Sequence, residues 1–239
     1  MIIQILVLSA LAVFIYTKGI LDLRGTLAAI LIGGPIIFLA GAQWFTLLLL
    51  FLFVSYAATK YRFADKEKLK VAEASRGKRN AINVLANGLI PAFFAFLLCY
   101  SSSFPDSVKA LTLAGYIAAI ATVTGDTLSS EIGVLSKHEP FLITSFKKVP
   151  RGTHGGISPL GETVGLLGTL AIGLASWILG VVSLSFAIPV AVIGGAIGFH
   201  FDSFLGATLE RRGLCGNATV NFLSTTAGAI AGLGLASAL

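Results

Sequence analysis

Long apolar runs alternate with short polar intervals along this sequence. A helix needs about 20 apolar residues to cross the roughly 30 Å hydrocarbon layer of a bilayer, and shorter segments are tolerated in a closely packed bundle. The chain contains seven or eight such segments: 2–17, 25–41, 43–59, 82–101, 108–124, 162–180, 184–201 and 219–238. The second and third are separated only around Ala42, which predicts a tight helical hairpin or a partly re-entrant pair. The pattern therefore predicts an all-α, polytopic membrane helix bundle.

The composition favours the same class of protein. Hydrophobic residues make up 56% and charged residues only 12% of the 239 positions. This composition is too apolar for a water-soluble fold with a single hydrophobic core. We expect residues 1–239 to form a single integral-membrane domain. The first segment lacks a basic leader and a small-residue cleavage site, so we expect a retained helix rather than a signal peptide. The two cysteines lack CxxC or His/Cys spacing, so neither a disulfide framework nor a zinc site is expected.

The distribution of positive charge predicts how the segments are oriented. If the basic loop at 60–80 lies in the cytoplasm, alternation of eight spans brings the intervals near Lys18, at 125–161 and at 202–218 to the same side. All but one of the 17 lysines and arginines then lie inside, the exception being Lys109, as the positive-inside rule favours. Both termini are expected outside. We therefore expect a cell or organelle membrane protein whose polar site faces the cytoplasm.

The interval 125–161 carries the densest candidate chemistry. It places GDTLSSEIG, a lysine pair and RGTHGGISPLG between two apolar segments, where polar groups are costly unless they bind something. Its acidic side chains could hold a divalent cation, its basic side chains could neutralise phosphate, and its glycines could let backbone N–H groups approach oxyanions. These residues are, in that order, Asp126 and Glu131; Lys147, Lys148 and Arg151; and Gly152, Gly155 and Gly156. The pattern indicates a phosphate-handling active site at a membrane surface.

Two interpretations of Asp126 are open. A helix-capping role would leave the charged cluster that follows it unexplained. On a helix, Asp126 and Ser129 share a face while Glu131 is rotated away, so the two carboxylates converge only if the helix breaks or another segment supplies the second ligand. The favoured partner is Asp202 in FHFDSFLG, because an unpaired charge among aromatic residues at the end of a span would be expensive.

The loop at 60–80 also allows two interpretations. Its eight basic and three acidic residues are typical of a solvated loop that attracts anionic headgroups and sets the topology. Alternatively, its last basic residues and the asparagines after them reach the phosphate site. These residues are Arg76, Lys78, Arg79, Asn80, Asn83 and Asn87. The asparagines form one polar helical stripe, which should point into the bundle because lipid offers an amide no partner.

Other patterns are less specific. His154 in GTHGG could be a general base or a phosphate contact, and a loop residue without function fits its glycine-flanked setting equally well. Glycines at 161, 165 and 168, at 194, 195 and 198, and at 228 and 232 have the small-xxx-small spacing that packs helices without a ligand. Neither a GxxxxGK[ST] P-loop nor a GxGxxG fingerprint occurs, so nucleotide chemistry must come from the membrane bundle itself.

The order of motifs resembles a known membrane family. GDTLSSEIG, KKVPRGTHGGISPLGE, FHFDSFLGATLE and GNATVNFLSTTAG are similar to the integral-membrane family of uncharacterised proteins that includes the plant phytyl-phosphate kinase of tocopherol and phylloquinone synthesis. The resemblance covers nearly the whole chain and is most specific from Gly125 to Gly228. More distantly, the GDT element with its lysine pair and the DSxxG element ahead of a GN loop are similar to the dolichol kinase, phytol kinase and phosphatidate cytidylyltransferase superfamily. Those enzymes use CTP and Mg²⁺ at a membrane surface.

The resemblance implies a CTP- and Mg²⁺-dependent kinase that converts an isoprenyl monophosphate to the diphosphate. It implies Asp126 and Asp202 as Mg²⁺ ligands, with Glu131 as a third candidate, and Lys148 as a catalytic cation. The expected nucleotide- and phosphate-binding residues are Lys147, Arg151, Gly152, Thr153, His154, Gly155, Gly156, Ser158, Asn217, Asn221 and Asn83. An isoprenyl monophosphate is already nucleophilic at neutral pH, so no strong general base is required. The lipid tail is expected between spans lined by small residues.

Two other functions remain open. A CTP-using lipid cytidylyltransferase is disfavoured because the late loop reads GNATVNFL and lacks the PGHGGxxDRxD signature of those enzymes. A transporter of a phosphorylated or anionic metabolite should carry its polar groups at the bilayer midplane, often with an inverted repeat, whereas the polar groups here cluster at one face. The expected partners are the isoprenyl monophosphate, the nucleotide and the bilayer. No nucleic-acid partner is expected, and a homo-oligomer is left open.

Overall fold

The protein is a polytopic helical membrane protein, as predicted. The computed structural model describes residues 1–100 and 103–239, and their side chains except those of Ala74 and Arg76. Within these residues seven helical segments are long and apolar enough to cross a membrane. They are Leu23–Ala40, Ala42–Lys60, Ala81–Leu98, Asp106–Gly133, Pro159–Ile178, Leu184–Glu210 and Asn217–Ala236. An eighth apolar helix, α1 (Ile2–Thr17), has 16 residues and is shorter than the others. The predicted end of one span at Ser101 lies outside the described residues.

Two of the spanning segments, Leu23–Ala40 and Leu184–Glu210, combine α-helix with stretches of π-helix. The α-helices are α1 (Ile2–Thr17), α2 (Leu23–Pro35), α3 (Ala42–Lys60), α4 (Phe63–Lys68), α5 (Ala81–Leu98), α6 (Asp106–Gly133), α7 (Pro159–Ile178), α8 (Leu184–Pro189), α9 (Gly195–Leu205) and α10 (Asn217–Ala236). The π-helices are η1 (Ile36–Ala40), η4 (Val190–Gly194) and η5 (Gly206–Glu210), and η2 (Ala74–Gly77) is a 3₁₀ turn. Gly41, with φ of +109°, separates η1 from α3 and completes the tight hairpin expected around Ala42.

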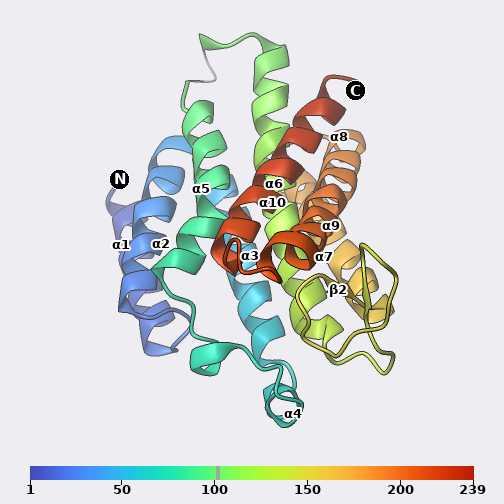
Figure 1. Ribbon diagram of the computed structural model, residues 1–239. Helices are drawn as coiled ribbons and strands as arrows, with labels where there is room; N and C mark the ends of the chain where they lie inside the picture. The colour runs from blue at the N-terminus through green and yellow to red at the C-terminus, as the bar shows by residue number, and fades with distance from the viewer. Residues whose placement is uncertain (101–102) are drawn as a thin grey trace.

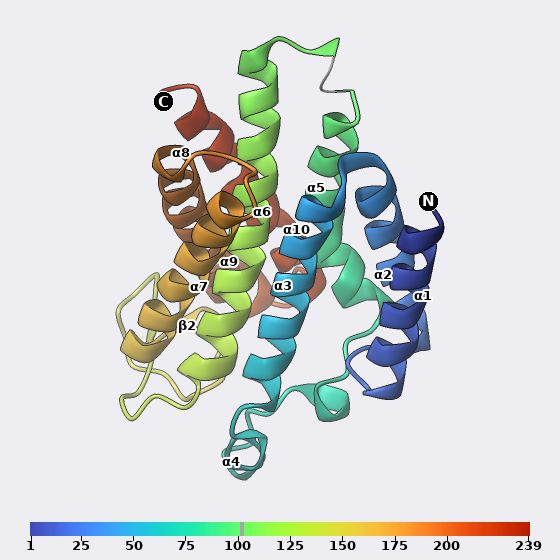
Figure 2. The same cartoon turned by 180° about the vertical axis from the view of Figure 1, so that it is seen from behind.

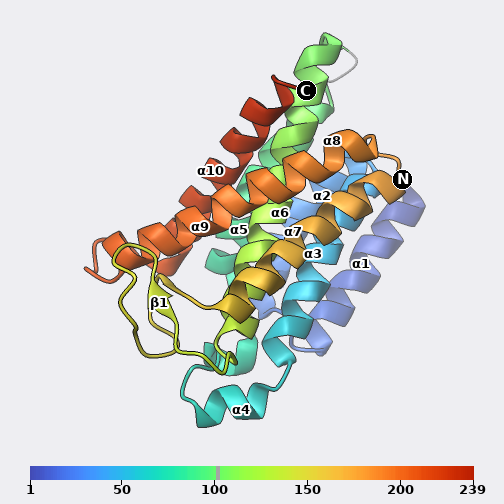
Figure 3. The same cartoon turned by 90° about the vertical axis from the view of Figure 1, so that its right-hand side faces the viewer.

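The helices run alternately up and down, and the polar loops gather at one end (Figures 1 and 2). The connections 18–22, 61–80 and 134–158 lie at the end that carries α4, whereas both termini point towards the other end. Seen from the side, the turn at 211–216 lies beside the segment that contains β1 (Figure 3). The basic residues therefore collect at one end of the bundle, as the alternation of eight helices predicts.

The centre of the bundle is α6. It packs against α3, α5, α7, α9 and α10, and residues 116–121 have no exposed surface. The hydroxyl of Tyr116 donates to the carbonyl oxygen of Trp44 at 2.6 Å, and the two rings meet edge to face at 4.9 Å. A buried phenol requires such a partner. This contact fixes α3 against α6.

Small residues let the neighbours of α6 approach closely, as the glycine spacing predicts. A Cβ added at Gly194 of η4 would lie 2.9 Å from the Cβ of Ala118, and one at Gly232 of α10 would lie 2.6 Å from the same atom. On the other side, a Cβ at Gly165 of α7 would lie 3.1 Å from the Cβ of Ser129. The close approach brings the polar ends of α6, α7, α9 and α10 together.

Two regions expected to be active-site loops are partly helical. Helix α6 continues to Gly133, through the whole GDTLSSEIG element, and the α9–η5 segment continues to Glu210. In the last turns of α6, Ser129 Oγ donates to the Asp126 carbonyl at 3.0 Å, and Ser130 Oγ donates to the Thr127 carbonyl at 3.1 Å. Hydropathy alone placed these ends too early, because the polar residues face a cavity rather than water.

A short two-stranded sheet is the one non-helical element among the described residues. Strand β1 (Phe141–Leu142) pairs antiparallel with β2 (Gly156–Ile157), with Phe141 opposite Ile157. The pair closes the segment between α6 and α7 into a compact flap over the polar end of the bundle (Figure 3). The flap carries the glycine-rich turn towards α9.

Candidate active site

A polar cavity of about 430 Å³ lies at the end of the bundle where the loops gather. Its walls come from α5, α6, α7, α9, η5 and α10, together with the loops before α5 and α7. Three helices begin at this cavity, and residues from their first turns line it: Asn83 of α5, Gly161 of α7 and Asn217 of α10. Helix N-termini carry partial positive charge, so this end of the bundle favours an anion.

Asp126 of α6 and Asp202 of α9 meet inside this cavity. Both carboxyl groups line the cavity and lie close enough to interact electrostatically, and Ser224 Oγ of α10 donates to Asp202 Oδ2 at 3.0 Å. Such short side chains can meet because the helices are close: a Cβ at Gly125 would lie 2.9 Å from the ring of Phe199. The structure thus brings together the two carboxylates that the sequence singles out.

The cavity is rich in negative charge. Six carboxylates line it, against two guanidinium groups. The carboxylates belong to Glu73, Asp126, Glu131, Glu162, Asp202 and Glu210, and the guanidinium groups to Arg79 and Arg151. Because like charges repel strongly where water is scarce, cations that accompany a phosphate would favour its entry into this cavity. The charge balance therefore suits a phosphate that arrives with a divalent metal ion.

Glu131 is held by a buried lysine rather than by the aspartate pair. Lys66 of α4 has no exposed side-chain surface, and its Nζ lies 2.7 Å from Glu131 Oε2. The other carboxylate oxygen accepts from Thr59 Oγ1 at 2.8 Å. No group of three or more His, Cys, Asp or Glu side chains within the described part of the chain is arranged to hold a metal ion. The structure therefore does not add Glu131 to the Asp126–Asp202 pair.

Arg79 is a cation that lines the cavity and lies near several of its carboxylates. Its backbone is fixed, because its N–H donates to the carbonyl of Ile20 at 3.3 Å and its carbonyl accepts from Asp22 at 3.1 Å. Burial lowers the pKa of the guanidinium, and the carboxylates of Glu131 and Glu73 act in the opposite direction. A guanidinium keeps its charge under such conditions. Arg79 therefore offers a fixed positive charge to a phosphate.

Two of the three asparagines of the predicted stripe, Asn83 and Asn87, point into the bundle, whereas Asn80 is exposed at the start of α5. Asn80 caps α5 by accepting from the backbone N–H of Asn83 at 3.0 Å, and Asn87 Nδ2 donates to the Asn83 carbonyl at 2.9 Å. The side chains of Asn83 and Asn87 line the cavity, and so does Asn221 of α10. Lys78 packs near Gly19 instead, and the side chain of Arg76 lies outside the described residues.

Two histidine–glutamate pairs border the cavity. His154 Nδ1 lies 3.0 Å from Glu210 Oε2, which joins the flap to η5. His200 Nε2 lies 2.9 Å from Glu162 Oε2, which joins α9 to the first turn of α7. Both pairs tie elements that are distant in sequence, so they fix the rim of the cavity.

The glycine-rich turn lines the cavity but uses some of its donors locally. The N–H of Gly156 and the hydroxyl of Thr153 bond to carbonyls within the turn, at 2.9 Å and 2.6 Å. Ser158 caps α7 by accepting from Gly161 at 3.2 Å, and it donates to Gly133 at 3.1 Å. Gly155, with φ of +74°, fits against the backbone of Ala207 where a Cβ would collide. Arg151 and Gly152 complete this wall.

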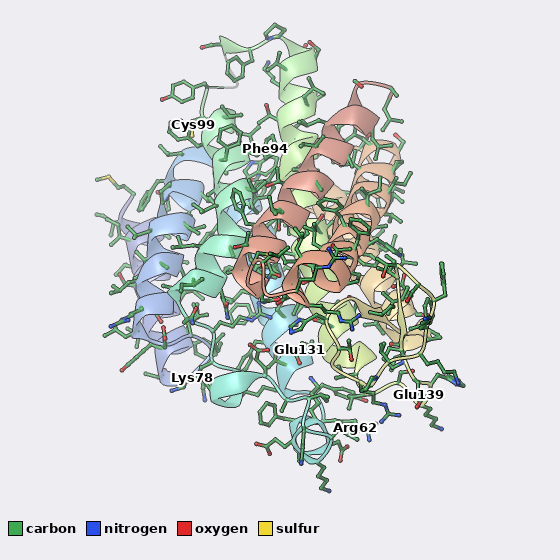
Figure 4. The ribbon with its side chains drawn as sticks, viewed as in Figure 1. Arg62, Lys78, Phe94, Cys99, Glu131 and Glu139 are labelled. Carbon is green, nitrogen blue, oxygen red and sulfur yellow. The ribbon has the colours of Figure 1, made fainter. Side chains whose placement is uncertain are left out.

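The lysine pair lies outside the cavity. Lys148 is 79% exposed, and its Nζ lies 3.6 Å from Glu139 Oε2. Glu139 lies at the outer edge of the flap, well away from Glu131 (Figure 4). Lys147 is also exposed, although its carbonyl accepts from Leu142 at 2.9 Å within the flap. In this structure the cavity's positive charge comes from Arg79 and Arg151 instead.

The fold and the site define a class of protein. It is a polytopic helical membrane protein with an acidic cavity at one end of its bundle, and the first turns of three helices line this cavity. More particularly, the chain belongs to the integral membrane protein family DUF92, whose model matches residues 6–229.

Relatives occur in archaea and plants. An uncharacterized membrane protein of Methanocaldococcus jannaschii is 35% identical over 232 residues, which cover 97% of this chain and 92% of the relative. Protein PGR of Arabidopsis thaliana is 33% identical, covering 90% of this chain and 81% of PGR. The chloroplastic protein VTE6 of the same plant is 30% identical, covering 88% of this chain and 63% of VTE6. No solved structure matches the chain significantly.

Proposed function

We propose that this protein is a membrane-embedded kinase that transfers the γ-phosphoryl group of CTP to an isoprenyl monophosphate, with Mg²⁺ as its metal. The observation that carries the proposal is the Asp126–Asp202 pair inside a cavity at which three helices begin. The motif resemblance to the family that includes plant phytyl-phosphate kinase supports the reaction. The similarity to the CTP-using superfamily supports the nucleotide.

The residues present fit Mg²⁺. This ion commonly takes one or two carboxylates from the protein and completes its octahedron with water and substrate phosphates. Asp126 and Asp202 supply two carboxylates from facing helices, and Ser224 orients one of them. When bound, Mg²⁺ would supply positive charge that offsets the negative charge of the nucleotide phosphates. The excess of carboxylates around the cavity is consistent with that role.

The protein's own cations and hydrogen-bond donors would neutralise the phosphate charge that the metal leaves. Arg79 and Arg151 both line the cavity, and the first turns of α5, α7 and α10 face it. The volume of about 430 Å³ is typical of small-molecule sites, which span roughly 300–1,000 Å³. In this assignment Lys147 and Lys148 stay outside the site, because they are exposed on the flap.

The reaction needs positioning more than acid–base chemistry. A phosphate monoester has a second pKa near 6, so the acceptor is largely a dianion at pH 7. One of its oxygens attacks the γ-phosphorus, and the bond between that phosphorus and the β–γ bridging oxygen breaks. The electron pair leaves with CDP. Arg79 and Arg151 orient the reacting phosphates and balance the charge that develops on them.

The polar end of the bundle faces the cytoplasm in this proposal. The basic loops gather at that end, and nucleotide and Mg²⁺ are available on that side. The isoprenyl monophosphate reaches the cavity from the bilayer.

A two-label assay tests the reaction. Purified protein is incubated with Mg²⁺ and geranylgeranyl monophosphate, and with CTP labelled on either the α- or the γ-phosphate. We expect label in the lipid product only from γ-labelled CTP, as geranylgeranyl diphosphate. Lipid label from the α-phosphate would indicate cytidylyl transfer. Absence of transfer from both nucleotides, across a panel of isoprenyl chain lengths, would contradict the kinase.

A further inference from the structure

A second, apolar cavity lies next to the polar one. It has a volume of about 70 Å³ and is lined mainly by residues of α1, α2, α3 and α5, at the opposite side of α6 from α9. Its walls are almost entirely hydrocarbon, from side chains such as Leu11, Ile32 and Phe51. An apolar cavity inside a membrane bundle suits a hydrocarbon group, because neither water nor a polar ligand would find a partner there.

The two cavities share a wall. Arg79, Asn83 and Asn87 line both of them. Asn83 and Asn87 follow each other by one turn on α5, and the backbone of Arg79 is fixed to the α1–α2 turn through Ile20 and Asp22. A row of fixed polar groups thus separates an anion-accepting space from an apolar one. This arrangement matches a ligand that has one charged end and one hydrocarbon chain.

From this geometry we infer that the lipid acceptor lies across the shared wall, with its phosphate beside Arg79 and Asn83 and its chain between α1, α2, α3 and α5. The inference rests on the proposed function and adds where the acceptor sits. It assigns the hydrocarbon chain of the acceptor to the side of the bundle formed by α1, α2, α3 and α5. The nucleotide then binds on the side formed by α7, α9, η5 and α10. The ligand class is a phosphate monoester of a long hydrocarbon chain.

The cavity runs into the bilayer rather than along its surface. On α3 its wall extends from Phe45 to Leu52, which is about 10 Å at the helical rise of 1.5 Å per residue. The polar cavity adjoins the end of this wall nearer Lys60. A cavity of this size holds only the first part of a long chain. The rest would leave beside α1, an outer helix whose one buried residue is Ile15.

A pair of substitutions on one helix tests the site. Ala12 of α1 lines the apolar cavity, whereas Ala10 is exposed on the same helix and does not line it. We expect Ala12→Phe to raise the KM for geranylgeranyl monophosphate on the order of tenfold, equivalent to losing about two buried methylene groups. The KM for isopentenyl monophosphate and for CTP should not change, and Ala10→Phe should behave as the unsubstituted protein. Equal effects of the two substitutions, or equal effects on short and long acceptors, would overturn the inference.

A binding measurement separates this inference from the proposed reaction. Geranylgeranyl monophosphate carrying a diazirine on its chain is photolysed with the unsubstituted protein, and the labelled peptides are identified. We expect label in α1, α2, α3 or α5, and much less of it in Ala12→Phe. The inference is overturned if label appears only in α7, α9 or α10. It is also overturned if excess unmodified lipid does not reduce the labelling. Either result counts even if the kinase reaction is observed. Label in the expected helices without phosphoryl transfer supports the lipid site and contradicts the proposed reaction alone.

Discussion

Removal of the Lys66 amine should destabilise the protein far more than removal of any exposed lysine. Lys66 Nζ lies 2.7 Å from Glu131 Oε2 and donates to the carbonyls of Ala58 and Thr59 at 2.8 Å and 3.2 Å. Those carbonyls belong to the last turn of α3, where no further turn of the helix supplies N–H partners. One ammonium group thus neutralises a carboxylate of α6 and caps the end of α3.

The size of the effect follows from burial. Lys66 has no exposed side-chain surface and Glu131 has 11%. Removing one member of a buried ion pair commonly costs about 3–5 kcal/mol, because the other charge is left without its partner. For a chain of this size, each kcal/mol lowers the unfolding midpoint by about 2–4 °C. We therefore expect Lys66→Met to lower the midpoint on the order of 10 °C.

Thermal unfolding in detergent, followed by size-exclusion chromatography, measures this shift. Lys68→Met is the matched control, because Lys68 is exposed on the same short helix and the substitution removes the same charge. The control should stay within about 0.5 kcal/mol of the unsubstituted protein. Adding Glu131→Gln to Lys66→Met should recover part of the loss, since it removes the stranded charge. A midpoint for Lys66→Met equal to that of Lys68→Met would refute the buried ion pair.

Three further outcomes are expected. In a protein without native cysteines, single cysteines at positions 70 and 145 should react with a membrane-impermeant reagent from one side and a cysteine at position 104 from the other; labelling of 70 and 145 from opposite sides would contradict the arrangement of the bundle. Arg79→Ala should reduce phosphoryl transfer by at least tenfold and Lys148→Ala by less than twofold, because only Arg79 lines the cavity; the reverse order would return the lysine pair to the site. Chelation with EDTA should abolish transfer and added Mg²⁺ should restore it, whereas transfer that persists in EDTA would exclude the proposed metal.

The arrangement of helices was largely predictable from the sequence. Long apolar runs and the positions of the basic residues depend on the bilayer, which acts on each segment separately. The ends of α6 and of the α9–η5 segment were not predictable in this way. Their last turns are polar because they face an internal cavity, and hydropathy cannot distinguish a polar group in a cavity from one in a loop.

The candidate site was predictable where charge conflicts with its surroundings. Asp126 and Asp202 stand out because each follows an apolar stretch, and the structure brings them together. The lysines could not be sorted in the same way. Lys66 and Lys148 both lie in polar intervals, yet one is fully buried and the other is 79% exposed. That difference depends on where α4 and the flap pack, which no local pattern records.

The most direct test of the proposed active site compares phosphoryl transfer by Asp126→Asn and Asp202→Asn with transfer by Glu139→Gln. All three substitutions replace a carboxylate with an amide, but Glu139 is 65% exposed on the flap, outside the cavity. We expect each aspartate substitution to lower turnover by at least a hundredfold, with an unfolding midpoint within a few degrees of the unsubstituted protein, because mainly the charge that holds the metal and its nucleotide is lost. Glu139→Gln should retain full activity. Near-normal turnover in either aspartate variant would contradict the assignment of the cavity between α6 and α9 as the active site.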